Sequence, residues 1–208
     1  KLYIGEYYQD ENKRHTCLFG KKLMVVGHQK HATPEERSKY NSIDDFNYPL
    51  EDVKSIEELT DGTWESWDPS DRKSYLQFGR MLTGDTRLSM DGMVDLWKSI
   101  AFCNYLQVPD INLADRQGRD EDYLYEMAKP IFLDKLLEAQ PEKVIVWGVD
   151  TPSFKYIKNA LGVSTLEHEF QVTFNNRKID FLNIPHPCRL PQGGYDVVIT
   201  KIKEFLEK

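Results

Sequence analysis

Two short apolar runs, each ending in a glycine, constrain the fold of this chain more than any other feature. Residues 23–26 read Leu-Met-Val-Val and lead into Gly27, and residues 144–147 read Val-Ile-Val-Trp and lead into Gly148. Neither run alternates between apolar and polar side chains, so both faces of each strand must be covered. Such coverage is typical of a parallel sheet with helices on both sides. The two runs therefore indicate an α/β protein.

Helical patterns occupy much of the sequence between these runs. The spacing of apolar residues predicts helices over residues 71–82, 89–100, 151–161 and 195–206. Another helical pattern contains Pro130, which predicts two helices, 120–128 and 131–139, because proline lacks the amide hydrogen that a helix interior uses.

The C-terminal third also contains a hairpin pattern. Segments 170–174 and 178–182 flank Asn175 and Asn176, which tolerate the positive φ angles of a tight turn. No linker or repeat divides the chain, so we expect one domain over residues 1–208. Strands alternating with helices predict a three-layer α/β/α sandwich around a central, mostly parallel four-stranded sheet.

The composition excludes several classes of protein. Of the 208 residues, 40% are hydrophobic and 29% charged, which is too apolar for a disordered chain. No stretch approaches the roughly 18 apolar residues of a membrane helix, so no membrane partner is expected. The 27 basic and 34 acidic side chains leave a net charge of −7, which argues against strong non-specific binding of polyanions. The three distant cysteines, Cys17, Cys103 and Cys188, suit a reducing compartment, so we expect a cytoplasmic protein. We also expect a monomer.

Three segments carry side chains suited to binding a flat heterocycle. They are residues 27–31, 101–107 and 184–189, each at or after an expected strand or helix end. Ligands of open α/β sheets collect beyond the carboxyl ends of the strands, where such loops converge. Phe102 offers an aromatic face, Asn104 an amide that both donates and accepts, and His186 a ring N–H. We therefore expect these three side chains to share one pocket.

The order of these motifs resembles that of the uracil-DNA glycosylase superfamily, and in particular its less characterised bacterial uracil-DNA glycosylase-like branch. The most specific similarity is the run from Leu96 to Gln107, Leu-Trp-Lys-Ser-Ile-Ala-Phe-Cys-Asn-Tyr-Leu-Gln. Residues 143–148 are similar to the third strand of that branch, and His186-Pro187 to the His-Pro loop of the superfamily. The resemblance spans roughly residue 22 to the C-terminus and implies excision of uracil or another damaged base from DNA, without a metal or organic cofactor.

The resemblance also implies roles for individual residues. Phe102 would stack under the extruded base, Asn104 would pair with its edge, and His186 would stabilise the departing base. The loop after His186 would press into the DNA, and the first loop would line the sugar and place the attacking water. The implied catalytic residues are His28, Gln29 and His186, and the implied substrate-binding residues are Gly27, Phe102, Asn104, Pro187 and Arg189.

The first loop departs from the superfamily pattern. Members commonly hold Asp, Glu or Asn there, whereas this chain reads Gly27-His28-Gln29-Lys30-His31, without a carboxylate. An imidazole or an amide orients water but does not balance a sugar cation as a carboxylate does.

Three alternatives therefore stay open. The first is a non-catalytic module that binds DNA or a nucleobase-containing ligand on the same fold. The second is a different small-molecule hydrolase, since a fold does not fix a reaction. The third is a zinc site, because His28 with His31 and His186 with Cys188 have ligand-like spacings.

Overall fold

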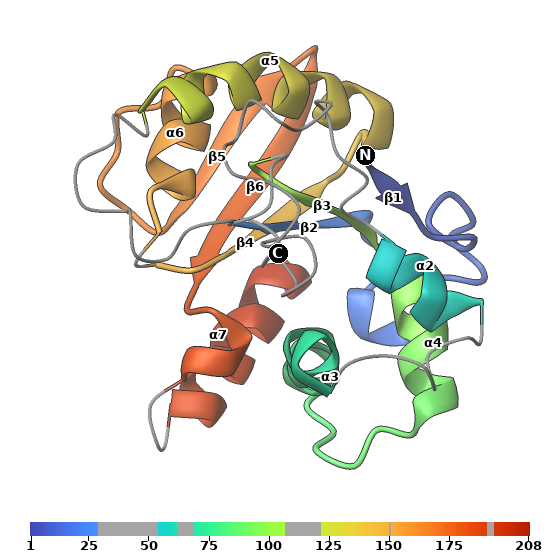
Figure 1. The fold of residues 1–208 in the computed structure, drawn as a ribbon. Coiled ribbons are helices and arrows are strands. Elements are labelled where there is room, and N and C mark those ends of the chain that lie inside the picture. The colour runs from blue at the N-terminus through green and yellow to red at the C-terminus, as the bar shows by residue number, and fades with distance from the viewer. Residues whose placement is uncertain (29–53, 62–68, 107–121, 150, 191–193) are drawn as a thin grey trace, which may run out of the picture.

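The computed structural model of the protein describes residues 1–28, 54–61, 69–106, 122–149, 151–190 and 194–208. These residues form an α/β fold around one mixed sheet (Figure 1). The strands are β1 (Tyr3–Ile4), β2 (Leu23–Gly27), β3 (Ala101–Asn104), β4 (Lys143–Trp147), β5 (Glu169–Phe174) and β6 (Arg177–Ile184). The helices are η1 (Thr16–Leu18), α2 (Lys54–Thr60), α3 (Pro69–Thr83), α4 (Met90–Lys98), α5 (Asp122–Ala139), α6 (Ser153–Ala160), η4 (Pro187–Arg189) and α7 (Gly194–Glu207).

The sheet has six strands in the order β1-β3-β2-β4-β6-β5, so the expected four-stranded sheet is wrong. Strands β3, β2, β4 and β6 pair parallel to one another, and the edge strands β1 and β5 pair antiparallel with β3 and β6. The missed strands, β1 and β3, are only two and four residues long. Their pairing depends on partners distant in the sequence, which local patterns do not reveal.

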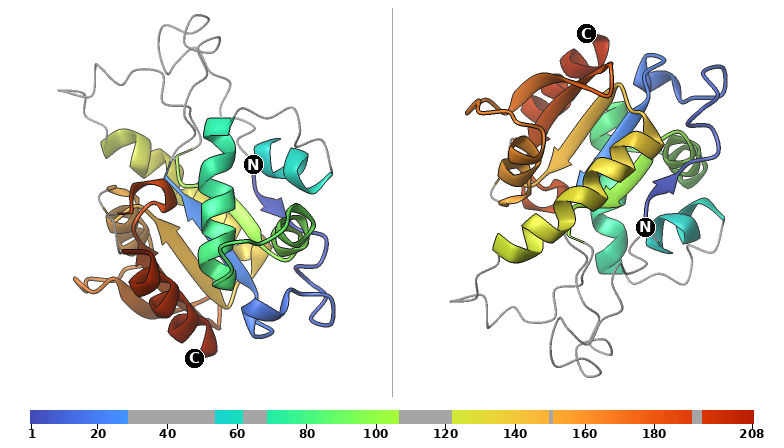
Figure 2. Two further views of the ribbon diagram at one scale, coloured as in Figure 1. Left: turned by 90° about the horizontal axis from the view of Figure 1, so that it is seen from below. Right: turned by 90° about the horizontal axis from the view of Figure 1, so that it is seen from above.

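Helices cover both faces of the sheet (Figure 2). One face carries Val25, Phe102, Ile145, Trp147 and Leu182 and packs against α2, α3, α4 and α7. The other carries Met24, Val26, Val144, Val146 and Phe181 and packs against α5 and α6. Successive side chains of each inner strand thus enter different cores, which explains why the strand sequences are apolar throughout. We call these two sides the α3 face and the α5 face.

Helix α5 runs unbroken through Pro130, so the prediction of two helices on either side of this proline is wrong. Proline removes one amide donor and crowds the carbonyl four residues earlier, which here belongs to Glu126. Both Pro130 and Glu126 are exposed, so the carbonyl group that loses its donor lies on the solvent side of the helix. The buried residues Ala128 and Phe132 lie on either side of the proline and hold both halves against the sheet.

The hairpin prediction is confirmed by β5 and β6, which are joined through Asn175 (φ 48°) and Asn176 (φ 62°). Helices α3, α4, α6 and α7 confirm the expected helices at those places within a few residues. Among the described residues, no helix combines the length and apolar character needed to cross a bilayer.

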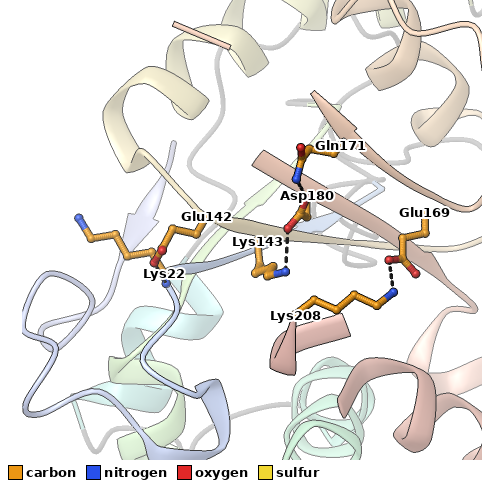
Figure 3. Close-up of polar contacts among 7 residues, drawn as sticks. All are labelled: Lys22, Glu142, Lys143, Glu169, Gln171, Asp180 and Lys208. Carbon is orange, nitrogen blue, oxygen red and sulfur yellow. Dashed lines mark hydrogen bonds and ion pairs between the residues drawn. The ribbon is translucent and has the colours of Figure 1, made fainter. Parts of the chain in front are cut away.

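Polar contacts tie together the end of the sheet opposite to the expected pocket (Figure 3). Lys143 of β4, whose side chain is 3% exposed, donates to Asp180 Oδ2 of β6 at 2.7 Å. The other carboxylate oxygen of Asp180 accepts from Gln171 Nε2 at 2.7 Å. At the surface nearby, Lys208 of α7 pairs with Glu169 of β5 at 2.6 Å.

Candidate functional site

The carboxyl ends of β2 and β4 form the point of the sheet where ligands are expected. These strands are neighbours, but the next described helix after β2, α2, packs on the α3 face, whereas α6 after β4 packs on the α5 face. In open α/β sheets, ligands usually bind beyond the strand ends where neighbouring connections diverge to opposite faces. The expected site residues surround this point.

Gly27, Phe102 and Asn104 lie together on the α3 face. Gly27 is the register partner of Asn104 in the parallel pair of β2 and β3. The Asn104 amide folds over the glycine so closely that a Cβ at residue 27 would overlap Asn104 Oδ1 and lie 3.3 Å from Phe102 Cζ. The absence of a side chain at residue 27 therefore provides the space that the Asn104 amide occupies.

Trp147 connects this group to His186. Its ring centroid lies 5.6 Å from that of Phe102 and 5.9 Å from that of His186. Trp147 is 3% exposed, and its indole N–H has no hydrogen-bond partner among the described residues. The structure therefore brings Phe102, Asn104 and His186 to the same face of the same sheet edge, arranged around Gly27 and Trp147.

Phe102 is 1% exposed, because aromatic rings surround it. Tyr75 of α3 meets it edge-on at 5.5 Å between ring centroids, and Trp97 of α4 does so at 6.1 Å. Tyr75 is only partly buried and lies on the outer side of this cluster. A base stacked on Phe102 would therefore take the position of the Tyr75 ring.

The position of His186 in the chain fixes its tautomer. His186 is the N-cap of η4, and its Nδ1 accepts the backbone N–H of Cys188 at 3.3 Å. A nitrogen that accepts carries no proton, so the proton of the neutral ring lies on Nε2. Pro187 occupies the first position of η4, where its fixed φ favours the turn and its lack of an N–H costs nothing. His186 therefore presents a donor through Nε2.

The same device occurs once more in the described part of the chain. His15 precedes η1, and its Nδ1 accepts the backbone N–H of Cys17 at 3.3 Å. The cap angles are nearly identical, φ −57° and ψ 134° at His15 and φ −60° and ψ 132° at His186. Burial lowers the pKa of His15, so the capping ring is neutral near pH 7. The backbone N–H of His15 donates to Ser99 Oγ just before β3 begins, so His15 lies at the opposite end of β3 from Asn104.

The remainder of the His-Pro loop contacts α3. Cys188 Sγ lies 3.1 Å from Ser74 Oγ, which holds η4 against this helix. Pro187 is buried, so its contribution to a site is the shape of the loop, whereas Arg189 is exposed. An exposed cation next to His186 suits contact with a phosphate.

His28 follows Gly27 but turns to the α5 face. Its Nδ1 lies 2.7 Å from Ser153 Oγ at the start of α6, and its ring stacks on Tyr125 of α5 at 6.0 Å between centroids. The structure thus does not bring the His28 ring to the face that holds Phe102 and Asn104. A catalytic role for His28 remains a prediction, and Gln29 lies outside the described residues.

The zinc alternative gains no support from this geometry. His28 and His186 lie at different strand ends and face opposite cores, and His31 lies outside the described residues. Within the described ranges, no three His, Cys, Asp or Glu side chains gather in a way that would hold a metal ion.

The sequence analysis did not identify Trp147 and Tyr75, which belong to this site, or Ser153, which contacts His28 on the α5 face. The available signal for Trp147 was a large aromatic residue at the last position of a parallel strand, directly before a glycine. Neither a scan against protein-family models nor a search of curated proteins found a match to this chain. The chemistry that the site offers is a stacking ring, an amide and an imidazole N–H at the carboxyl ends of β3 and β6, with Trp147 of β4 between them.

Proposed function

We propose that this protein is a DNA glycosylase that hydrolyses the N-glycosidic bond of uracil or another damaged base. The observation that carries the proposal is the arrangement of Phe102, Asn104 and His186 around Gly27 and Trp147 at one edge of the sheet. The α/β fold with helices on both faces is compatible with the uracil-DNA glycosylase superfamily, which the motif order resembles.

In this proposal the base enters against Phe102 from the side of α3, displacing Tyr75. The Asn104 amide donates to and accepts from the hydrogen-bonding edge of the base, which selects a ring with a carbonyl next to an N–H. Because a flipped nucleotide must leave the duplex, Arg189 and the rigid His-Pro loop would hold the adjacent backbone.

The chemical step breaks the bond between C1′ of the sugar and the ring nitrogen of the base. The electron pair of that bond goes to the base, which leaves as an anion, and a water molecule adds to the sugar cation at C1′. His186 keeps its Nε2 proton and donates a hydrogen bond from it to the carbonyl oxygen on which negative charge develops. A neutral donor serves this purpose, because its hydrogen bond strengthens as the charge grows. The water that adds at C1′ loses one proton to the solvent, and the departed base anion takes up a proton from the solvent.

The proposal is tested by incubating the protein with an oligonucleotide that contains one uracil and measuring free base. The unaltered protein should release uracil, and Asn104→Ala should lower the rate by at least about 100-fold, because the base edge would lose its hydrogen-bond donor and acceptor. His186→Asn is more informative than His186→Ala, because asparagine still caps η4 but places no donor at the position of Nε2.

A matched control separates chemistry from stability. His15→Ala removes the equivalent cap of η1, which should cost about 1 kcal/mol of folding free energy, yet it should leave the release rate unchanged. If His186→Asn retains full activity, or if His15→Ala loses as much as His186→Asn, the role given to His186 is wrong.

A second function is favoured by the first loop, which lacks a carboxylate from Gly27 to His31. A protein with this pocket but no carboxylate to balance the sugar cation would bind a base without cleaving it. Affinity for a uracil-containing strand above that for the matching thymine strand, with no free base formed, would identify such a binding module.

A further inference from the structure

Lys135 of α5 is a buried cation without a carboxylate partner among the described residues. It is 6% exposed, although an ammonium group is rarely buried without a compensating charge. Lys143, the other buried lysine of the described part, is 2% exposed and pairs with Asp180 at 2.7 Å. A buried ammonium that lacks this compensation is suited to a site where negative charge appears during function.

The contact that Lys135 makes lies at the candidate site. Its Nζ lies 3.5 Å from the backbone carbonyl oxygen of Asn104. The next residue, Tyr105, donates its N–H to Gly27 of β2. Because successive residues of a strand point to opposite sides, the Asn104 carbonyl faces the outer edge of β3.

Lys135 reaches the Asn104 carbonyl beyond the described pairing of β1 with β3, which joins Tyr3 to Phe102 and Ile4 to Ala101. The ammonium therefore supports the end of β3 from the outside, directly behind the residue whose amide faces Gly27. Its charge acts at this place through protein instead of water, so screening is weak.

We propose that Lys135 is a positioning residue of the base site, which holds Asn104 and stabilises the anion of the departing base. The inference rests on the glycosylase function proposed above. Lys135 approaches from the α5 face and does not touch the base, so it acts through the peptide of Asn104 and through its field. As the glycosidic bond breaks and its electron pair moves to the base, the cation lowers the energy of that negative charge.

The test compares two leaving bases, uracil and 5-fluorouracil, in otherwise identical oligonucleotides. The fluorinated base is the more acidic and needs less help to leave as an anion. Lys135→Met removes the charge and the hydrogen bond, whereas Lys135→Gln removes the charge but retains a donor toward Asn104. Lys203→Met, at an exposed position of α7, is the control for the loss of one positive charge.

Both Lys135 variants should release uracil roughly tenfold more slowly and 5-fluorouracil only about twofold more slowly, and Lys203→Met should match the unaltered protein. A purely structural role would slow both bases by the same factor. That result, or full activity of Lys135→Gln, would overturn the inference. The melting temperatures of all variants show which of them are folded.

A binding measurement decides the matter independently of turnover. The ¹⁹F NMR signal of 5-fluorouracil bound to the protein should report ionisation of the base at a lower pH than in free solution. Lys135→Met should remove that shift, and because His186 is still present, the difference isolates Lys135. If the protein releases no base, the glycosylase proposal fails, and this signal alone tests Lys135. An unshifted ionisation, or no binding of either base, would refute the inference about Lys135.

Discussion

The ion pair between Lys143 and Asp180 should stabilise the fold more than any exposed pair drawn beside it (Figure 3). The two residues are register partners on β4 and β6, and their charged atoms are 2.7 Å apart. The Lys143 side chain is 3% exposed and also packs over the Phe205 ring at 4.8 Å. In Asp180→Asn the ammonium would lose its counter-charge but remain buried.

The magnitude follows from burial. Removing one partner of a fully buried pair costs about 3–5 kcal/mol. The Asp180 side chain is 27% exposed, so water recovers part of that loss, and we expect about 2–3 kcal/mol. For a chain of this size, each kcal/mol lowers the melting temperature by about 2–4 °C. Asp180→Asn should therefore melt about 5–10 °C lower.

Urea unfolding at pH 7 measures the loss, and an unchanged slope with urea would show that the unfolded states are comparable. The control is Glu169→Gln, which breaks the pair with Lys208 on the same hairpin, where the two side chains are 60% and 38% exposed. That variant should lose less than about 1 kcal/mol. Equal losses for the two variants would refute the argument that burial sets the value of these pairs.

Three further predictions concern acid stability and two glycines. Burial alone would raise the pKa of Asp180, but hydrogen bonds from Lys143 and Gln171 lower it below its usual value of 3.8. The stability that Asp180 contributes is therefore complete above about pH 4 and is lost as the pH falls through the lowered pKa. In urea unfolding at decreasing pH, Asp180→Asn should lack this part of the decline in unfolding free energy. Gly148→Ala should lower the unfolding free energy by about 1–2 kcal/mol in urea unfolding, because φ is +94° at this residue and a Cβ would lie 2.8 Å from Thr151 Cγ2. An unchanged unfolding free energy would contradict this strain. Gly27→Ala should displace the Asn104 amide and lower the affinity for the base at least about tenfold, while the protein stays folded. An unchanged affinity in an equilibrium titration would show that the Asn104 amide does not recognise the base.

The parts of the fold that the sequence predicts are those in which local patterns agree with tertiary packing. Strands β2 and β4 were expected because they are buried on both faces, and the hairpin because Asn175 and Asn176 adopt the left-handed angles its turn requires. Strand β3 was missed because its four residues directly follow a helix. Only its pairing with β2 makes it a strand.

The site was predictable to a similar extent. Phe102 and Asn104 are two residues apart, so once β3 is a strand they must share a face. The same rule turns His28 away from them, since it follows Gly27 by one position and reaches Ser153 on the α5 face. No sequence pattern predicts the role of Lys135, because its contact with the Asn104 carbonyl depends on where α5 crosses the sheet.

The central claim is that one edge of the sheet binds a base through Asn104 and His186, and an NMR titration with free uracil tests it most directly. In ¹⁵N-labelled protein, the side-chain amide of Asn104, the indole N–H of Trp147 and the ring of His186 should shift together along one binding curve. Shifts confined to the opposite end of the sheet, around Lys143, or no saturable shift at all, would contradict the account.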